Sequence, residues 1–84
     1  MANNHWSAVK YNLSLMTKQQ RFQDFKYFRT HRPNWSDHLM DALYLVVVDL
    51  ETQAYAAQLF GMHKQEINRA VKKYKVYLGG NNLS

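Results

Sequence analysis

The stretch that decides the fold is residues 52–71, TQAYAAQLFGMHKQEINRAV. Two helices that cross at a steep angle need a small side chain at the crossing, and Ala57 supplies it. The tight turn between them needs a residue that tolerates positive φ, and Gly61 does so without a Cβ clash. Met62 and Ile67 then fill the space between the helices. The spacing predicts a helix-turn-helix whose second helix keeps a free polar face that can enter a major groove.

The ends of these two helices follow from capping residues. Thr52 is expected to cap the first helix, which ends near Phe60. The second helix begins around residues 63–64 and runs to about Leu78, where Gly79-Gly80 ends it. Its apolar residues share one side at helical spacing, which predicts a buried face made of Ile67, Ala70, Val71, Tyr74 and Leu78.

A further helix is expected upstream, where Thr17 is placed to cap a segment that runs to about Thr30. Pro33 stops it, because the residue before a proline is pushed out of the α conformation. Three aromatic side chains of this helix fall within one arc and are expected to point inward together: Phe22, Phe25 and Phe28.

Ser36 is the next capping residue, with Asp37 in the first turn, where the helix dipole favours negative charge. The helix it opens carries one apolar stripe: Leu39, Leu43, Val46, Val47 and Leu50. The run Leu45–Val48 also suits a strand, but the helical spacing is kept and a lone strand would lack a partner. Three residues lie off the stripe and are either buried in a central helix or part of a subunit contact: Tyr44, Leu45 and Val48.

The fold class predicted from these elements is all-α: one compact domain of four to five helices that contains the helix-turn-helix. The chain has 84 residues, enough for one small core. Residues 1–15 are interpreted as an N-terminal arm or weak helix, with Trp6 as an anchor. Residues 16–80 form the helix-turn-helix domain, and residues 81–84 form a tail.

Charge is distributed unevenly along this basic chain, whose formal net charge is +5. Residues 1–36 carry six Lys and Arg and one Asp, and residues 64–84 carry five Lys and Arg and one Glu. Residues 37–63 carry four Asp and Glu and no Lys or Arg. Positive ends around an acidic middle indicate two surfaces that face a polyanion.

Several other classes of protein lack support in this sequence. It has no cysteine, and its histidines, His5, His31, His38 and His63, show no metal-ligand spacing. Phosphate-loop and Ser-His-Asp patterns are also missing, so neither an enzyme nor a cofactor is expected. The longest apolar run, Ala42–Val48, is far short of the ~20 residues of a membrane helix. The start shows no signal-peptide pattern, so a cytoplasmic protein is expected.

The polar face of the last helix offers side chains that can read base edges. Arg69 can pair with guanine O6 and N7, while Gln65 and Asn68 can pair with adenine N6 and N7. Lys64 lies at the helix start, where side chains reach deepest into the groove. The DNA base-reading residues are therefore predicted to be Lys64, Gln65, Asn68 and Arg69.

A second set of residues is expected to contact phosphates, which positions a protein without specifying sequence. Gln53 opens the preceding helix, where its side chain and the amides at the helix start can hold a phosphate. His63 is a helix cap, a phosphate contact or simply exposed. Glu66 does not fit a phosphate surface and is expected to pair with Arg69 or Lys73 and to favour the helix start. The predicted phosphate contacts are Gln53, His63, Lys72 and Lys75.

Two stretches resemble the KorA/TrfB family of plasmid-encoded transcriptional repressors. Residues 47–71, VVDLETQAYAAQLFGMHKQEINRAV, are similar to its DNA-binding core, and residues 16–25, MTKQQRFQDF, resemble its opening helix. The resemblance covers roughly residues 16–78. The layout is also similar to that of the PapB-type regulators of fimbrial operons.

This resemblance implies an all-helical domain that binds a palindromic operator as a dimer and represses plasmid genes. By position, the recognition helix would be Lys64–Leu78, with Lys64, Gln65, Asn68 and Arg69 facing the bases. The chain departs from the family in two places. Leu50-Glu51 stands where the family has a glycine before the first motif helix, and the family's C-terminal dimerisation segment has no counterpart, which leaves the dimer mode open.

The sequence thus predicts a regulator, most readily a repressor, that binds specific double-stranded DNA and acts in the cytoplasm at the nucleoid. The resemblance implies that it represses plasmid or mobile-element genes and that a homodimer would bind a palindromic operator. The alternative is a helical protein-interaction module acting on polymerase or another regulator, suggested by the acidic middle and by residues 44–48. A weaker alternative is single-stranded RNA binding by the basic aromatic helix near the N-terminus.

Overall fold

The computed structural model describes residues 13–32 and 34–83, which form one short 3-10 helix and four α-helices and contain no strand. The predicted all-α class is therefore confirmed. The 3-10 helix η1 spans Leu13–Leu15, and the rest of the predicted N-terminal arm, with Trp6, lies outside the described residues, as does Pro33. The α-helices are α2 (Lys18–Thr30), α3 (Asp37–Val47), α4 (Gln53–Phe60) and α5 (Lys64–Leu83).

Three of the α-helices begin at the hydroxyl residues that the sequence predicted as caps. In each case the side-chain oxygen accepts a hydrogen bond from the backbone N–H three residues later, at 3.0–3.2 Å. This bond satisfies one of the amides that the first helical turn leaves without a partner. The capping residues are Thr17, Ser36 and Thr52.

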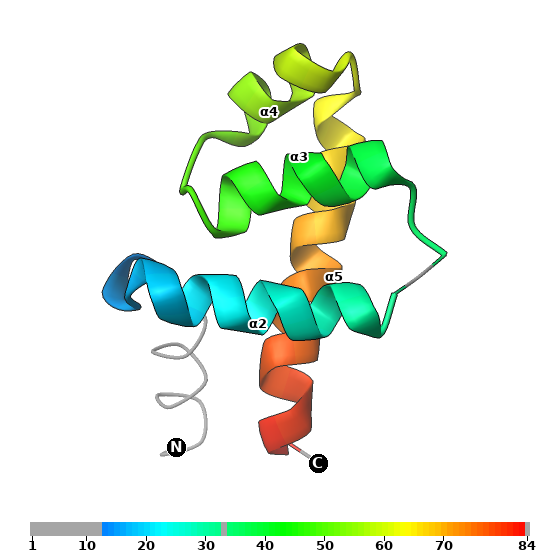
Figure 1. The fold of residues 1–84 in the computed structure, drawn as a ribbon. Helices are drawn as coiled ribbons and strands as arrows, with labels where there is room; N and C mark the ends of the chain where they lie inside the picture. The colour runs from blue at the N-terminus through cyan, green and yellow to red at the C-terminus, as the bar shows by residue number, and fades with distance from the viewer. Residues whose placement is uncertain (1–12, 33, 84) are drawn as a thin grey trace.

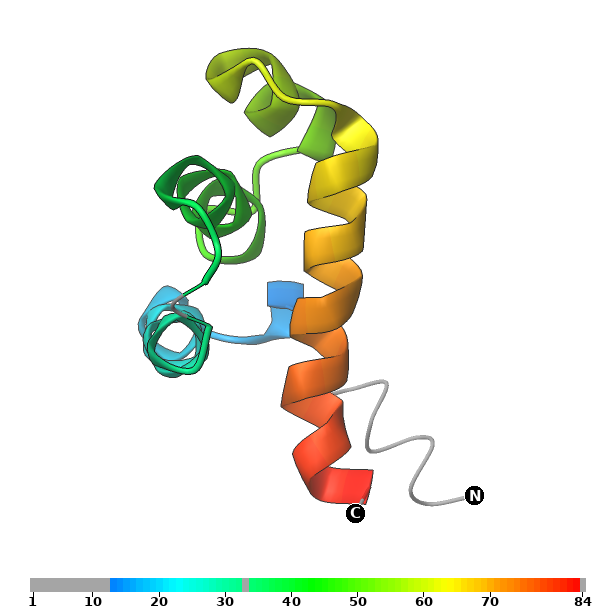
Figure 2. The same ribbon diagram turned by 90° about the vertical axis from the view of Figure 1, so that its right-hand side faces the viewer.

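The long helix α5 runs the length of the described structure, and the other helices pack on one side of it. Figure 1 shows α2 and α3 crossing in front of α5, one above the other, with α4 at the end where α5 begins. Figure 2 shows the same arrangement from the side, with α2 and α3 stacked against one face of α5 and its opposite face uncovered by these helices. Within residues 13–32 and 34–83, the packing of α2, α3 and α4 therefore leaves one side of α5 facing outward.

The core lies where α2, α3 and α4 meet α5, and its largest fully buried side chains are Tyr74, Phe28, Leu43, Ile67, Val47 and Val48. Phe28 is surrounded by rings, with centroid distances of 4.9 Å to Tyr74, 5.2 Å to Tyr77 and 5.3 Å to Trp35. Edge-to-face pairs of this kind stabilise a core beyond the area that they bury.

Of the three phenylalanines expected to point inward, Phe25 and Phe28 are buried, but the prediction for Phe22 is wrong. Phe22 is 41% exposed, and its ring lies edge-to-face with that of Tyr44 at a centroid distance of 6.4 Å. The reason is that Arg21, one position earlier, takes the inward side of α2 next to Phe25 and Phe28. Phe22 is turned to the flank of the helix.

Arg21 is buried and ties three segments together through backbone carbonyls. Its Nε donates to the carbonyl oxygen of Val48 at 2.8 Å. Its Nη1 donates to the carbonyl oxygens of Leu13 and Met16. Because α3 ends at Val47, the guanidinium links α2 to the end of α3 and to the segment that precedes α2.

The predicted stripe of α3 is correct up to Val47 but wrong for Leu50. The helix covers residues 45–47, so the strand alternative does not apply there. Beyond it the chain turns, the N–H of Glu51 donates to the Leu45 carbonyl at 2.9 Å, and Leu50 is 43% exposed with a φ of 60°. Of the residues off the stripe, Val48 is buried, while Tyr44 and Leu45 are half-buried.

The predicted end of the last helix at Gly79-Gly80 is also wrong, because α5 continues to Leu83. A glycine ends a helix when it adopts the left-handed conformation. Among the described residues, only Leu50 and Gly61 have positive φ, so Gly79 keeps a helical backbone. Residues 81–83, assigned to a tail, therefore belong to α5, and Ser84 lies outside the described residues.

Candidate nucleic-acid interface

The connection between α4 and α5 is a tight turn with positive φ at Gly61, as the sequence predicted. Gly61 adopts a left-handed conformation, with φ 62° and ψ 37°. Its N–H donates to Gln58 at 3.4 Å, and the N–H of Met62 donates to the Ala57 carbonyl at 2.8 Å. These two bonds form a Schellman motif, which ends a helix and redirects the chain within two residues. Ala57 is buried in the core, 7% exposed, and the half-buried Met62 packs against the core.

The inner face of α5 holds the helix in a fixed orientation. All five residues predicted to line it are at most 6% exposed: Ile67, Ala70, Val71, Tyr74 and Leu78. Because α-helical side chains repeat every 3.6 residues, burying this stripe turns the opposite stripe toward solvent. The side of α5 that faces outward in Figure 2 is therefore its polar side.

The start of α5 is stabilised by Glu66, whose Oε1 accepts the backbone N–H of His63 at 3.2 Å. This bond is one half of a capping box, in which an acidic side chain in the first turn reaches back to the residue before the helix. This bond agrees with the prediction that Glu66 favours the helix start, whereas the predicted ion pair with Arg69 or Lys73 is not found among the described residues. The bond leaves both cations available for other contacts.

The predicted base-reading residues lie on the outward side of α5. Lys64, Gln65 and Arg69 are exposed, and Asn68 is half-buried. The predicted phosphate contacts His63, Lys72 and Lys75 are exposed as well. Within the described part of the chain, no hydrogen bond or ion pair engages the side chains of these seven residues, so they are free to contact a ligand.

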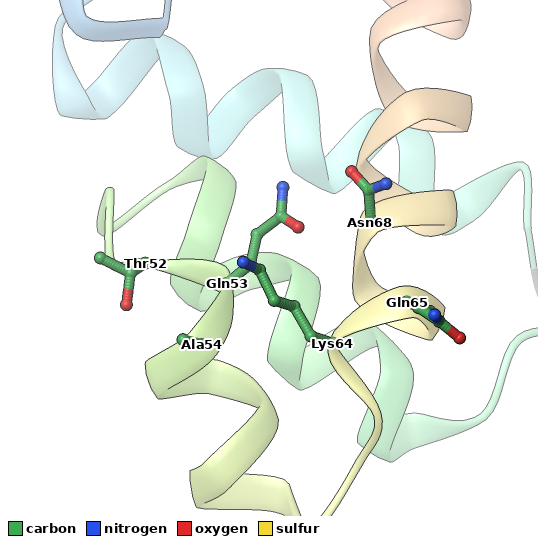
Figure 3. A pocket seen from close by; sticks show the side chains of 6 residues that line it. All are labelled: Thr52, Gln53, Ala54, Lys64, Gln65 and Asn68. Atoms are coloured by element: carbon green, nitrogen blue, oxygen red, sulfur yellow. The ribbon is translucent and has the colours of Figure 1, made fainter.

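A groove of about 520 Å³ lies where the beginnings of α4 and α5 come together (Figure 3). Thr52, Gln53 and Ala54 line it from α4, and Lys64, Gln65 and Asn68 line it from α5. In Figure 3 the side chains of Gln53, Lys64 and Asn68 extend over the opening between the helices, while Gln65 points away from it. The groove thus unites one predicted phosphate contact with three predicted base readers.

Arg69 lies outside this groove, on the other flank of α5. There it borders a smaller hollow of about 220 Å³, together with Trp35, Leu39, Glu66, Ala70 and Lys73. The sequence did not connect Trp35 with the site, because the loop before α3 reaches α5 only through tertiary packing. It also did not place Thr52 and Ala54 beside Lys64, although their position at a helix start is a signal for anion binding.

The electrostatics of the two basic segments differ. On α2, Lys18 pairs with Asp49 at 3.1 Å, and Arg29 lies 3.8 Å from Asp37. Exposed pairs of this kind contribute little stability, but they reduce the local positive potential. The five cations of α5 have no such partner among the described residues. Two acidic side chains of residues 37–63 thus lie beside cations of α2, whereas the cations of α5 stay unpaired among the described residues.

Residues 13–32 and 34–83 contain no group of three or more His, Asp and Glu side chains that could hold a metal ion. None of their helices is both long enough and apolar enough to cross a bilayer. Comparisons with protein-family models, curated proteins and solved structures find no match to this chain. The site is thus defined by its geometry: a polar, cationic face of one helix, held outward beside the start of a second.

Proposed function

We propose that this protein is a transcriptional regulator that binds specific sequences of double-stranded DNA through α5. The observation that carries the proposal is the free polar side of the first turns of α5, next to the start of α4. A major groove about 12 Å wide admits one α-helix. Because α2 and α3 pack on the opposite side, α5 can enter a groove without a clash from these helices.

The base contacts come from the first two turns of α5. Arg69 donates two hydrogen bonds to guanine O6 and N7, the commonest specific contact in the major groove. Gln65 and Asn68 each pair with the N6 and N7 atoms of an adenine. Lys64 contacts a base from the start of α5, where side chains reach deepest into the major groove. These four residues are exposed or half-buried and are not engaged by other described side chains.

The phosphate contacts come from both sides of α5. Gln53 and the free amides at the start of α4 hold one strand, because a helix N-terminus carries partial positive charge. Lys72 and Lys75 reach phosphates farther along α5, and His63 contacts a phosphate near its start. These contacts fix the register of α5 in the groove and carry no sequence information themselves.

The regulatory role follows from the resemblance to the KorA/TrfB repressors, and we propose repression of plasmid or mobile-element genes at the nucleoid. A dimer on a palindromic operator would place its half-sites about 10 bp apart, or a multiple of that distance. Sedimentation of the protein with and without the operator tests this part separately. A complex of one protein chain with one half-site would contradict the dimer.

The decisive experiment is the selection of bound sequences from a random duplex pool, followed by competition with single-stranded RNA. We expect a consensus, a preference for duplex DNA and affinity that falls steeply with salt, because Lys and Arg displace counterions from phosphates. Failure to retard any duplex at low salt would contradict DNA binding. A preference for RNA would instead support recognition by the basic aromatic helix α2.

A second candidate function, a protein-interaction module, is favoured by the outer side of α4. Tyr55 and Leu59 lie one turn apart and are 48% and 55% exposed, within a segment that has no Lys or Arg. Exposed apolar side chains that lie next to each other form a surface patch to which another protein can bind. Binding of purified RNA polymerase, lost in a Tyr55→Ser, Leu59→Ser double variant that still binds DNA, would support this function.

A further inference from the structure

Val76 is an exposed apolar side chain in the middle of the polar side of α5. Its exposed fraction is 67%, the largest among the described bulky apolar side chains that are exposed on α3, α4 or α5. The other large apolar side chains of α5 up to Leu78 are buried, or half-buried in the case of Tyr77. Val76 is thus the one departure, among these described side chains, from the separation of apolar and polar faces on this helix.

An exposed valine on a helix is unfavourable in two ways. Its β-branched side chain loses rotamer freedom against the preceding turn, which lowers helix propensity relative to alanine. Its apolar surface also stays in contact with water. A single exposed apolar residue is common on protein surfaces. The position of Val76 relative to the base-reading residues gives it a specific significance.

Val76 continues the line of side chains that starts with Gln65 and Arg69. Seven residues separate Arg69 from Val76, and seven residues of an α-helix return to within about 20° of the same face. At 1.5 Å per residue, the two side chains are about 10 Å apart along the axis, which corresponds to about three base pairs. Lys72, on the intervening turn, lies on the same side and is exposed.

We propose that Val76 contacts the C5-methyl group of a thymine, about three base pairs from the guanine that Arg69 reads. Thymine is the base that presents a methyl group in the major groove, and apolar side chains recognise it by contact. The inference rests on the proposed function, since it requires α5 to lie in the groove along most of its length. It adds a specificity-determining residue in the fourth turn of the helix.

The test replaces each thymine of the selected operator, one at a time, with deoxyuracil, which removes the methyl group and keeps every hydrogen-bonding group. One replacement should weaken binding of the unaltered protein about fourfold, the effect of exposing one methyl-sized group. The same replacement should weaken binding of the Val76→Ala variant by clearly less than fourfold, because the single methyl group of alanine reaches less far toward the thymine. Leu59→Ala, an exposed apolar position on α4, is the matched control and should respond to uracil like the unaltered protein.

Two results would overturn the inference while leaving DNA binding by α5 in place. Either no uracil position distinguishes Val76→Ala from the unaltered protein, or Val76→Ala weakens binding to all duplexes equally. Failure of the proposed function would look different, because the random pool would then return no consensus. Circular dichroism of Val76→Ala checks that the helix is intact, and alanine at this exposed position favours helix formation.

Discussion

Leu50 and Gly61 adopt the same left-handed backbone conformation, with φ of 60° and 62°, on either side of α4. Gly61 follows the last residue of α4, and Leu50 stands two positions before its cap, Thr52. These two residues set the directions in which the chain enters and leaves α4. They therefore set the position of the start of α4 relative to α5, on which the groove between them depends.

Gly61→Ala should lower the free energy of unfolding by about 1 kcal/mol, because an L-residue in this conformation brings its Cβ close to the backbone. A Cβ built on Gly61 meets no atom within 4 Å, so the loss comes from the backbone alone and the fold should persist. Urea unfolding measures the change. Gly61→Asn is the control and should lose less, since asparagine tolerates this conformation better. An alanine variant as stable as the parent would contradict the conformation described for the turn.

Leu50→Gly should have the opposite effect and raise the free energy of unfolding by up to about 1 kcal/mol. Glycine relieves the strain of a left-handed leucine, and this gain exceeds the entropy that glycine adds to the unfolded chain. Little buried area is lost, because Leu50 is 43% exposed. Leu50→Ala separates the effect of losing the side chain from the effect of relieving the strain, since alanine removes the side chain and keeps the strain. If the glycine variant is no more stable than the alanine variant, strain at Leu50 is not significant.

Arg21→Met should destabilise the protein by about 2–3 kcal/mol, because it leaves buried carbonyl groups without donors. The guanidinium donates to Val48 at 2.8 Å and also reaches Leu13 and Met16. Methionine keeps most of the volume, so the loss reports on hydrogen bonds rather than on a cavity. Lys18→Met is the matched control, since it removes an exposed pair with Asp49 and should cost less than about 1 kcal/mol. Equal losses in the two variants would argue against a structural role for Arg21.

The parts of the fold that sequence predicts are those with local signals. The caps at Thr17, Ser36 and Thr52 depend on one hydroxyl and an amide three residues away, and the turn depends on Gly61. The burial of Arg21 was not predictable in this way, since its acceptors include Val48, which lies 27 residues away in the chain. The same reason explains Phe22, whose exposure depends on which neighbour takes the inward side of α2.

For the candidate site, helical periodicity alone predicted which side of α5 is buried, because the apolar stripe is complete from Ile67 to Leu78. It could not show that the start of α4 lies beside Lys64, since this depends on how the turn directs the two helices. The prediction that Gly79-Gly80 ends the last helix was wrong because a glycine ends a helix only when it takes the left-handed conformation. A sequence does not show which conformation a glycine takes.

Tyr74→Phe should raise the free energy of unfolding by about 1 kcal/mol at neutral pH, because the hydroxyl is buried without a hydrogen-bond partner among the described residues. The hydroxyl also makes stability depend on pH. Burial raises the pKa of Tyr74 well above its ordinary value of 10.0, and the charges of Asp24 and Tyr77 act in the same direction.

Below pH 10 the hydroxyl of Tyr74 is protonated in both states and adds no pH dependence. Above pH 10 the unfolded chain releases this proton while the folded chain keeps it, so stability falls as the pH rises. The advantage of Tyr74→Phe over the parent should therefore grow by up to about 1.4 kcal/mol per pH unit above 10. Urea unfolding of both proteins between pH 8 and about 11 measures the difference. A constant difference across that range would mean that the hydroxyl is not desolvated.

Arg69→Ala and Lys72→Ala should weaken DNA binding in different ways, although the two side chains lie one turn apart on the same exposed side of α5. Arg69 is proposed to pair with a guanine, so its loss should cost about 1–3 kcal/mol on the operator and relax discrimination at one base pair. Lys72 is proposed to contact a phosphate, so its loss should weaken all duplexes about equally. It should also reduce the slope of log K against log salt by about 0.9.

Binding titrations at several salt concentrations, on the operator and on single-base variants of it, separate the two patterns. Lys26→Ala is the matched control, because this exposed cation lies on α2, away from the proposed interface, and should change neither affinity nor discrimination. If Arg69→Ala weakened every duplex equally, Arg69 would be a phosphate contact on the flank that it shares with Lys73. Base reading would then be restricted to the side of α5 that faces α4.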